Sequence, residues 1–244
     1  MPKTDKTLRW RFIAGVALPL MGLISDIRVR GGENIPKTGS FIFAPCHFSA
    51  IDPIVMAIAL WKQGRTPRFM AKSSLFAIPV LGSILRWLGQ IPVERHGQER
   101  AMGPMKAARD LAKNGLGVII YPEGSLTRDP ELWPMRGKTG AVRMALDAGL
   151  PLIPAAHWGT ADLMPRYSGR LKFFPRKTID VLIGKPIDMS PFLGKPVDQK
   201  LLTQATLILM NTITDLQSQL RGEKAPEKRW DPLEHNQTTT GKFS

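Results

Sequence analysis

Residues 116–125 read LGVIIYPEGS, a β-branched run followed by a short glycine-containing loop. The run is bounded by Gly115 and Pro122, so it predicts a strand over residues 116–121. Comparable runs predict strands at 40–44, 68–71, 90–93, 152–156, 170–174 and 179–183. Helices are predicted between and after them at 53–61, 75–88, 99–113, 138–148 and 198–220. This alternation predicts an α/β fold in which helices lie on the faces of a sheet.

Composition indicates a folded and strongly basic protein. The 244 residues include 34 Lys and Arg against 20 Asp and Glu, a net charge of +14. This surplus predicts an anionic partner: a nucleic acid, an acidic membrane surface or a phosphorylated small molecule. No helix-turn-helix, zinc-finger or aromatic RNA-binding signature occurs, so no nucleic-acid partner is expected. The single cysteine, Cys46, excludes an intrachain disulfide, and no Cys and His spacing predicts a metal site.

The N-terminal segment combines basic and apolar residues. Residues 12–25 (FIAGVALPLMGLIS) carry no charge and follow several Lys and Arg residues. The stretch is shorter than the roughly 20 residues that a spanning helix needs. We therefore expect residues 1–26 to form a membrane-associating helix in the interface of an anionic membrane, with a buried core helix as the alternative. Residues 27–221 then form the main domain, and 222–244 form a loose polar C-terminal tail.

Residues 45–53 read PCHFSAIDP and place His47 five positions before Asp52. An imidazole can accept a proton from a hydroxyl near neutral pH, and a carboxylate on its other nitrogen fixes the tautomer. No G-x-S-x-G motif supplies an enzyme nucleophile, so the activated hydroxyl is expected to belong to the substrate. Cys46 is not expected to react, because adjacent residues of an extended segment point to opposite faces. The alternative is structural, with Asp52 as an N-cap before Pro53 and His47 as a hydrogen-bonded loop residue.

A loop and several cations are candidates for binding a phosphate. Gly124 lets a ligand approach the backbone, and free N–H groups beside the Ser125 hydroxyl suit an anion. Glu123 belongs to the same loop, for which an ordinary turn with a solvated carboxylate is the alternative. Basic residues follow several predicted strands, at Lys72, Arg95, Arg128 and Lys138. Arginine binds phosphate through two donors and lysine as a point charge, although each cation alone also fits a solvated surface.

Taken together, these motifs resemble the 1-acylglycerol-3-phosphate O-acyltransferase family, the lysophosphatidate acyltransferases. Four sequence blocks of that family are similar to four segments of this chain, in the family's order, over about residues 35–184. The segments are 47–52 (HFSAID), 91–95 (IPVER) with Lys72 before it, 121–125 (YPEGS) and 150–155 (LPLIPA). The chain departs from the family at Leu126, where arginine is usual, and has Arg128 two residues later.

The resemblance implies a fold, a reaction and roles for the site residues. The fold would be a single mixed β-sheet flanked by helices. The reaction would transfer a fatty acyl group from acyl-CoA or acyl-carrier protein to the free hydroxyl of 1-acylglycerol 3-phosphate, giving phosphatidic acid. His47 would be the general base, and Asp52 would orient it. The acceptor phosphate would contact Lys72, Arg95, Glu123, Gly124 and Ser125, with Arg128 and Lys138 as further candidates.

The same resemblance implies no cofactor beyond the acyl donor, and a peripheral or monotopic protein at the cytoplasmic face of the cell membrane. Other acceptors, glycerol 3-phosphate or a glycolipid, remain open. So does a basic membrane-binding protein that keeps His47 and Asp52 without turnover. A serine hydrolase is disfavoured, because the nucleophile motif is absent.

Overall fold

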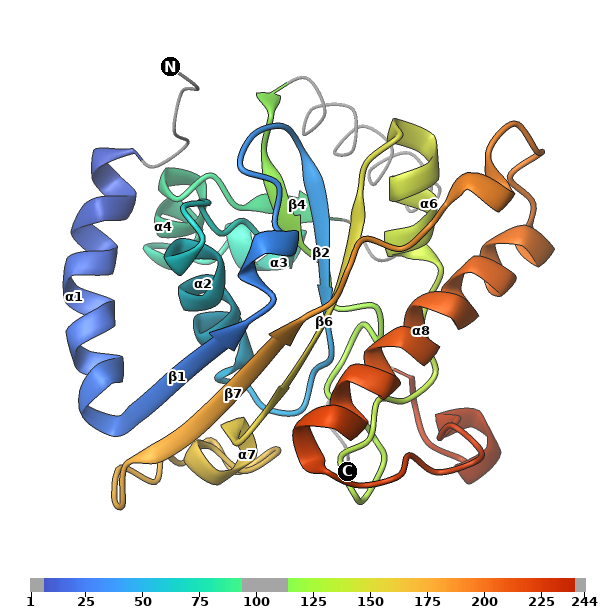
Figure 1. The fold of residues 1–244 in the computed structure, drawn as a ribbon. Coiled ribbons are helices and arrows are strands. Elements are labelled where there is room, and N and C mark those ends of the chain that lie inside the picture. The colour runs from blue at the N-terminus through green and yellow to red at the C-terminus, as the bar shows by residue number, and fades with distance from the viewer. Residues whose placement is uncertain (1–6, 94–113, 240–244) are drawn as a thin grey trace.

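The central element of the fold is a mixed β-sheet (Figure 1). The computed structural model describes residues 7–93 and 114–239, and in that part of the chain five strands pair in the order β1-β7-β6-β2-β5. They are β1 (Ser25–Arg30), β2 (Phe41–Pro45), β5 (Gly117–Ile119), β6 (Leu152–Trp158) and β7 (Lys177–Ile183). β6 and β7 pair antiparallel, whereas the other neighbours pair parallel. The predicted α/β fold with a mixed sheet is confirmed.

A two-stranded parallel sheet extends this arrangement. It consists of β3 (Met70–Lys72) and β4 (Ile91–Val93). Phe69, directly before β3, forms a parallel bridge to Ile119 of β5. The Ile119 N–H donates to the Arg68 carbonyl at 2.7 Å. β3 and β4 therefore lie beyond β5, at that edge of the main sheet.

Helices cover both faces of the sheet, because strand residues alternate between two apolar layers. In β2, Ile42 and Ala44 belong to one hydrophobic cluster and Phe41 and Phe43 to the other, and all four are fully buried. Four helices supply the layers: α1 (Leu8–Ile24), α2 (Asp52–Lys62), α6 (Gly140–Ala148) and α8 (Gln199–Arg221). α6 and α8 pack on the Ile42 side, and α1 and α2 pack on the Phe41 side (Figure 1).

The amphipathic C-terminal helix α8 is confirmed and is capped at both ends. The Asp198 carboxylate accepts the Leu201 N–H at 2.7 Å, and Gly222 ends the helix in the left-handed conformation at φ 66°. Apolar residues at three- and four-residue steps are buried against the sheet, namely Leu202, Ala205, Leu209, Ile213 and Leu216. Shorter helices are α7 (Thr160–Leu163) and the 3₁₀ turns Gly32–Asn34, Ser190–Phe192 and Pro232–His235.

Two predicted elements differ from the structure, and a third cannot be compared. The helix predicted at 75–88 is two helices, α3 (Ser73–Phe76) and α4 (Leu81–Trp87). They are separate because Pro79 has no N–H to donate and Val80 adopts a φ of 64°. The strand predicted at 170–174 is absent. The helix predicted at 99–113 lies outside the described residues.

The missing strand has a physical explanation. Phe173 and Phe174 are exposed, so no apolar layer covers the segment 170–174. The outer edge of β7 is instead occupied by β1, which pairs with β7 in parallel from Ser25 to Arg30. β1 is not among the strands predicted from the sequence.

The C-terminal segment is packed rather than loose over residues 229–239. Arg136 forms an ion pair with Asp231 at 2.8 Å, and its backbone N–H donates to the Trp230 carbonyl. The Trp230 ring stacks on His235 with ring centroids 3.5 Å apart. The prediction of a loose tail is wrong for this part, because specific polar contacts hold it where no apolar stripe does.

Helix α1 has a buried side and an exposed apolar side. Trp10 and Met21 are buried, and Met21 belongs to the cluster that contains α2. The opposite side of α1 exposes Leu8, Phe12, Val16, Leu20 and Leu23. Within the described chain, no helix has both the length and the apolar character to cross a bilayer.

Candidate active site

The candidate site lies where three neighbouring strands end. β5, β2 and β6 are adjacent and parallel, so the residues at their carboxyl ends meet at one edge of the sheet. His47 follows β2, Glu123 follows β5, and His157 is the penultimate residue of β6. The strand order alone therefore gathers two histidines and a carboxylate.

His47 and Asp52 form the pair that the sequence predicts. The His47 Nδ1 atom lies 2.9 Å from Asp52 Oδ2. Asp52 Oδ2 also accepts the N–H groups of Phe48, at 2.6 Å, and Ser49, at 2.8 Å. These donors precede α2, and no side chain caps that helix, so the N-cap interpretation of Asp52 is wrong. A carboxylate only accepts here, so Nδ1 carries the proton and the Nε2 lone pair is left for a substrate.

His157 is a second histidine on Asp52, and the sequence analysis does not single it out. Its Nε2 atom lies 3.2 Å from the Cys46 carbonyl and 3.5 Å from Asp52 Oδ2, and its Nδ1 atom lies 3.3 Å from the Thr160 hydroxyl. Burial opposes a charge on Asp52, but His157 and His47 together hold its pKa below the usual range. Asp52 is therefore an anion at neutral pH.

Glu123 holds the backbone around His47 in place. It is fully buried, and its two oxygens accept the backbone N–H groups of His47, at 2.9 Å, and Met135, at 3.0 Å. Burial raises its pKa to about 8, although these two donors act in the opposite direction. The sequence predicts Glu123 as a substrate-binding residue, whereas the structure ties both of its oxygens to the backbone. Its position indicates a supporting residue that fixes the loop onto His47.

Three polar side chains predicted to bind phosphate converge on the C-terminal segment. Ser125 Oγ and Lys138 Nζ donate to the Thr239 carbonyl at 3.4 and 3.1 Å. Arg128 donates to Thr238 Oγ1 at 3.4 Å. Gly124 has a φ of 73°, a conformation that favours glycine, and a Cβ there would lie 2.9 Å from Lys138 Nζ. The structure thus brings Gly124, Ser125, Arg128 and Lys138 together.

Two further predicted phosphate ligands cannot be compared. Lys72 ends β3, but only its backbone is described. Arg95 lies outside the described residues. Their roles stay predictions.

Cys46 lies on the other side of β2 from His47. It is fully buried in the cluster that contains α6 and α8, and its thiol lies 3.7 Å from Gln217 Oε1. Burial raises the pKa of the thiol. The side chain therefore occupies the core, where a neutral thiol is a poor nucleophile.

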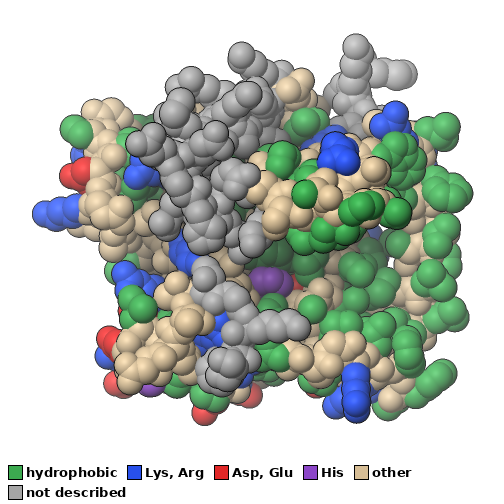
Figure 2. All heavy atoms as spheres, turned by 180° about the vertical axis from the view of Figure 1, so that it is seen from behind, with side chains coloured by type: hydrophobic (Ala, Val, Ile, Leu, Met, Phe, Trp, Pro, Cys, Tyr) green, Lys and Arg blue, Asp and Glu red, His purple; other side chains and the backbone are tan. Residues whose placement is uncertain are grey.

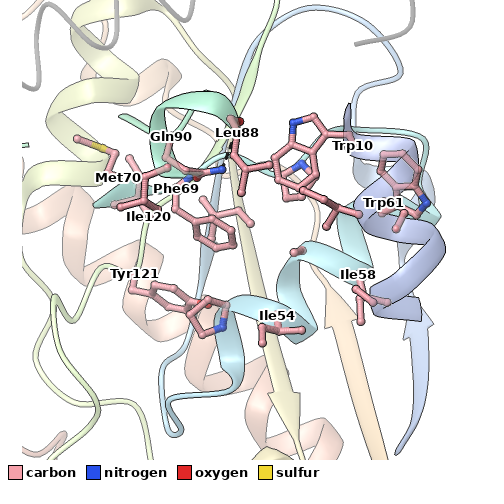
Figure 3. Close-up of a pocket in the computed structure, with 18 of the residues that line it drawn as sticks. Trp10, Ile54, Ile58, Trp61, Phe69, Met70, Leu88, Gln90, Ile120 and Tyr121 are labelled. Carbon is pink, nitrogen blue, oxygen red and sulfur yellow. Dashed lines mark hydrogen bonds between the residues drawn. The ribbon is translucent and has the colours of Figure 1, made fainter. Parts of the chain in front are cut away.

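A large apolar cavity opens beside His47. Its volume is about 930 Å³, and α1, α2, α4 and β5 supply most of its lining. Trp10 and Trp61 lie toward one end, and Met70 and Tyr121 lie toward the other (Figure 3). The Tyr121 ring stacks on His47 with centroids 4.0 Å apart. Figure 2 shows a histidine in the hollow, surrounded by apolar side chains.

Comparison with known proteins assigns the family. Residues 26–158, more than half of the chain, match the family model described as Acyltransferase. The chain belongs to this acyltransferase family. The matched range contains the His47–Asp52 pair, the Glu123 loop and the strand end at His157.

Curated relatives and a solved structure resemble this acyltransferase over between 65% and 86% of its chain. A 1-acyl-sn-glycerol-3-phosphate acyltransferase of Bacillus subtilis is 29% identical over 86% of this chain and 98% of its own length. The chloroplastic enzyme BAT2 of Brassica napus is 29% identical over 65% of this chain, and the match spans only 44% of that relative. The crystal structure of the LPA acyltransferase PlsC from Thermotoga maritima superimposes with a TM-score of 0.61 at 28% identity. It covers 85% of this chain and 79% of that one.

Proposed function

We propose that this acyltransferase moves a fatty acyl group from acyl-CoA or acyl-carrier protein to the free hydroxyl of 1-acylglycerol 3-phosphate, giving phosphatidic acid. The observation that carries the proposal is the His47–Asp52 pair, 2.9 Å apart, at a 930 Å³ apolar cavity. The cavity suits a fatty chain, and the basic loop beside it suits a phosphate. The choice of 1-acylglycerol 3-phosphate as the acceptor is supported by the names of the relatives, which are 1-acyl-sn-glycerol-3-phosphate acyltransferases.

His47 acts as the general base in this proposal. Its Nε2 atom takes the proton of the acceptor hydroxyl as the oxygen attacks the thioester carbonyl. The tetrahedral intermediate then expels the thiolate, which receives that proton from the imidazolium. Buried Asp52 stabilises the imidazolium and holds the ring. A thioester is already activated, so no acyl-enzyme is required.

The acceptor phosphate binds on the polar side of His47. Ser125, Arg128 and Lys138 supply a hydroxyl, a guanidinium and an ammonium there, and they now contact Thr238 and Thr239. A phosphate has stronger acceptors than a backbone carbonyl, so it displaces the C-terminal segment from these donors. Lys72 and Arg95 remain further phosphate ligands in this proposal.

The proposed site of action is the cytoplasmic membrane surface. The exposed apolar side of α1 lies in the interface, with the basic residues Arg9 and Arg11 at its start near anionic headgroups. The buried side of α1 lines the cavity through Trp10, Ala14 and Ala17. An acyl chain can therefore pass from the bilayer into the cavity along this helix.

An acyl-transfer assay with a panel of acceptors tests the function. Purified protein in anionic vesicles receives a radiolabelled acyl-CoA or acyl-carrier protein, together with 1-acylglycerol 3-phosphate, glycerol 3-phosphate or a glycolipid. We expect labelled phosphatidic acid from the first acceptor, at least about 10²-fold less of it with His47→Ala, and normal activity with the control Lys200→Ala. Product from another acceptor alone, or full activity of His47→Ala, would overturn the proposal.

A further inference from the structure

The segment that contains α3 and α4 exposes a second apolar surface. Its exposed apolar side chains are Leu75, Ile78, Val80, Leu81, Ile84 and Trp87. Val80 stands at the turn between the helices and is 72% exposed. Single exposed apolar residues are ordinary, but a contiguous group of this size marks a contact surface. We call residues 75–87 the α3–α4 hairpin.

This hairpin adjoins α1. Arg9 of α1 donates to the Trp87 carbonyl at 3.4 Å, and its guanidinium lies 5.7 Å from the centre of the Trp87 ring. On the inner side, Trp10 and Leu85 line the same cavity. α1 and the hairpin are therefore neighbours that line one cavity with their inner sides.

A small basic pocket lies at the contact between α1 and α4. Its volume is about 230 Å³, and its lining includes Arg9, Arg68 and Arg86. Arg86 donates to the Phe76 carbonyl at 2.7 Å, which fixes its side chain. Within residues 7–93 and 114–239, no carboxylate lines this pocket, and neither Arg9 nor Arg86 forms an ion pair. Arg9 and Arg86 bring two guanidinium groups to this pocket, which suits a bound anion.

We propose that the α3–α4 hairpin is a second membrane-docking element, and that Arg9 and Arg86 in this pocket hold the phosphate of an anionic phospholipid. The hairpin side chains enter the acyl region of the monolayer while the arginines stay at the level of the headgroups. A soluble phosphorylated ligand fits less well, because it would leave the bordering Val80, Ile84 and Trp87 in water. The inference rests on the proposed membrane location and not on the identity of the acceptor.

A fluorescent probe on Val80→Cys tests the insertion. The only native cysteine, Cys46, is buried, so an environment-sensitive thiol reagent labels position 80 selectively. We expect a blue shift with vesicles of phosphatidylglycerol and phosphatidylcholine. The matched control is Leu207→Cys, an exposed position of α8 on the other side of the sheet, and it should not shift. A protein that co-sediments with these vesicles without a shift at position 80 would exclude the hairpin.

Substitution of one arginine tests the phosphate pocket. Arg86→Gln should weaken co-sedimentation with anionic vesicles about 5-fold, since a cation at such a surface contributes about 1 kcal/mol. Lys200→Gln removes the same charge from the exposed start of α8 and should have little effect. Equal losses in both variants would show attraction by net charge alone and overturn the pocket. Acyl transfer by the wild-type protein in detergent reports on the proposed function separately, so the two failures can be told apart.

Discussion

The two sides of His47 are built in different ways. On one side, the cavity wall consists mainly of apolar side chains from α1, α2 and the segments 67–88 and 119–121, with few polar atoms. On the other side, the segment 123–138 is tied by single hydrogen bonds, such as the Thr127 N–H to the His47 carbonyl at 2.7 Å and the Lys138 N–H to the Pro122 carbonyl at 2.7 Å. Apolar contact is non-directional, whereas hydrogen bonds fix positions. We therefore expect substitutions that line the cavity to change activity gradually, and substitutions on the polar side to cause larger losses.

The largest effect is expected at the residues that serve both sides. His47→Ala removes the proposed base, and Asp52→Asn can favour the wrong tautomer, so each should lower kcat by about 10²–10⁴-fold. Because the two residues act together, the double variant should lose little more than His47→Ala alone. Steady-state kinetics of folded variants provide the measurement. Multiplicative losses would mean that Asp52 acts independently of His47.

The polar side is tested next, with Lys138→Ala. Loss of a charged hydrogen bond costs about 1.5–3 kcal/mol, so the acceptor KM should rise roughly 10–150-fold while the donor KM stays near the wild-type value. Lys200→Ala, an exposed change on α8, is the control. If both KM values rose together, Lys138 would be supporting the loop instead of contacting the phosphate.

Substitutions on the apolar side should have smaller effects on activity. Ala14→Phe narrows the cavity from α1, so the preferred acyl chain should become shorter. Each methylene that no longer fits forfeits about 0.8 kcal/mol, roughly 4-fold in kcat/KM, measured over donors of increasing chain length. Val16→Phe introduces the same side chain on the exposed side of this helix and should leave the preferred acyl-chain length unchanged. A uniform loss at every chain length would contradict the assignment of the cavity.

The smallest effect is expected at Cys46. Cys46→Ala should keep activity within about 2-fold and lower the free energy of unfolding by about 1 kcal/mol, because the thiol is buried in the core beside Gln217 and does not contact His47 or the cavity. Activity and thermal melting of the variant measure both quantities. A folded but inactive Cys46→Ala, or an isolated acyl-Cys46 species, would require a covalent mechanism.

Much of the fold is predictable from the sequence, because buried strands need β-branched runs and amphipathic helices need a periodic stripe. β1 is the exception. Asp26, Arg28 and Arg30 interrupt its apolar residues, and they are tolerated because β1 lies at the edge of the sheet with these side chains half-buried or exposed. The alternation of Ile27 and Val29 with charged residues is itself the pattern of a half-buried strand, so the sequence does carry a signal for β1.

The part of the site whose residues lie close together in the sequence is predictable. His47 and Asp52 are five residues apart, and the turn between them forms their contact. His157 reaches Asp52 only through the pairing of β6 with β2. A signal for it exists, since it directly follows the predicted strand 152–156, as His47 follows another. The contacts of Thr238 and Thr239 have no such signal, because single hydrogen bonds leave no periodic pattern.

Helix α2 joins two tasks in one rigid element. Its first residue, Asp52, contacts the proposed base His47, and the next turns line the cavity through Ile54, Ala57 and Ile58. A bulkier side chain on α2 would press the helix against an acyl chain and displace Asp52, and a shift of about 1 Å in such a group can cost about 10²-fold in rate. Redesign of chain-length specificity should therefore begin on α1, whose cavity-lining residues hold no catalytic group. Substitutions on α2 would change the chain-length selectivity but would also lower the turnover rate.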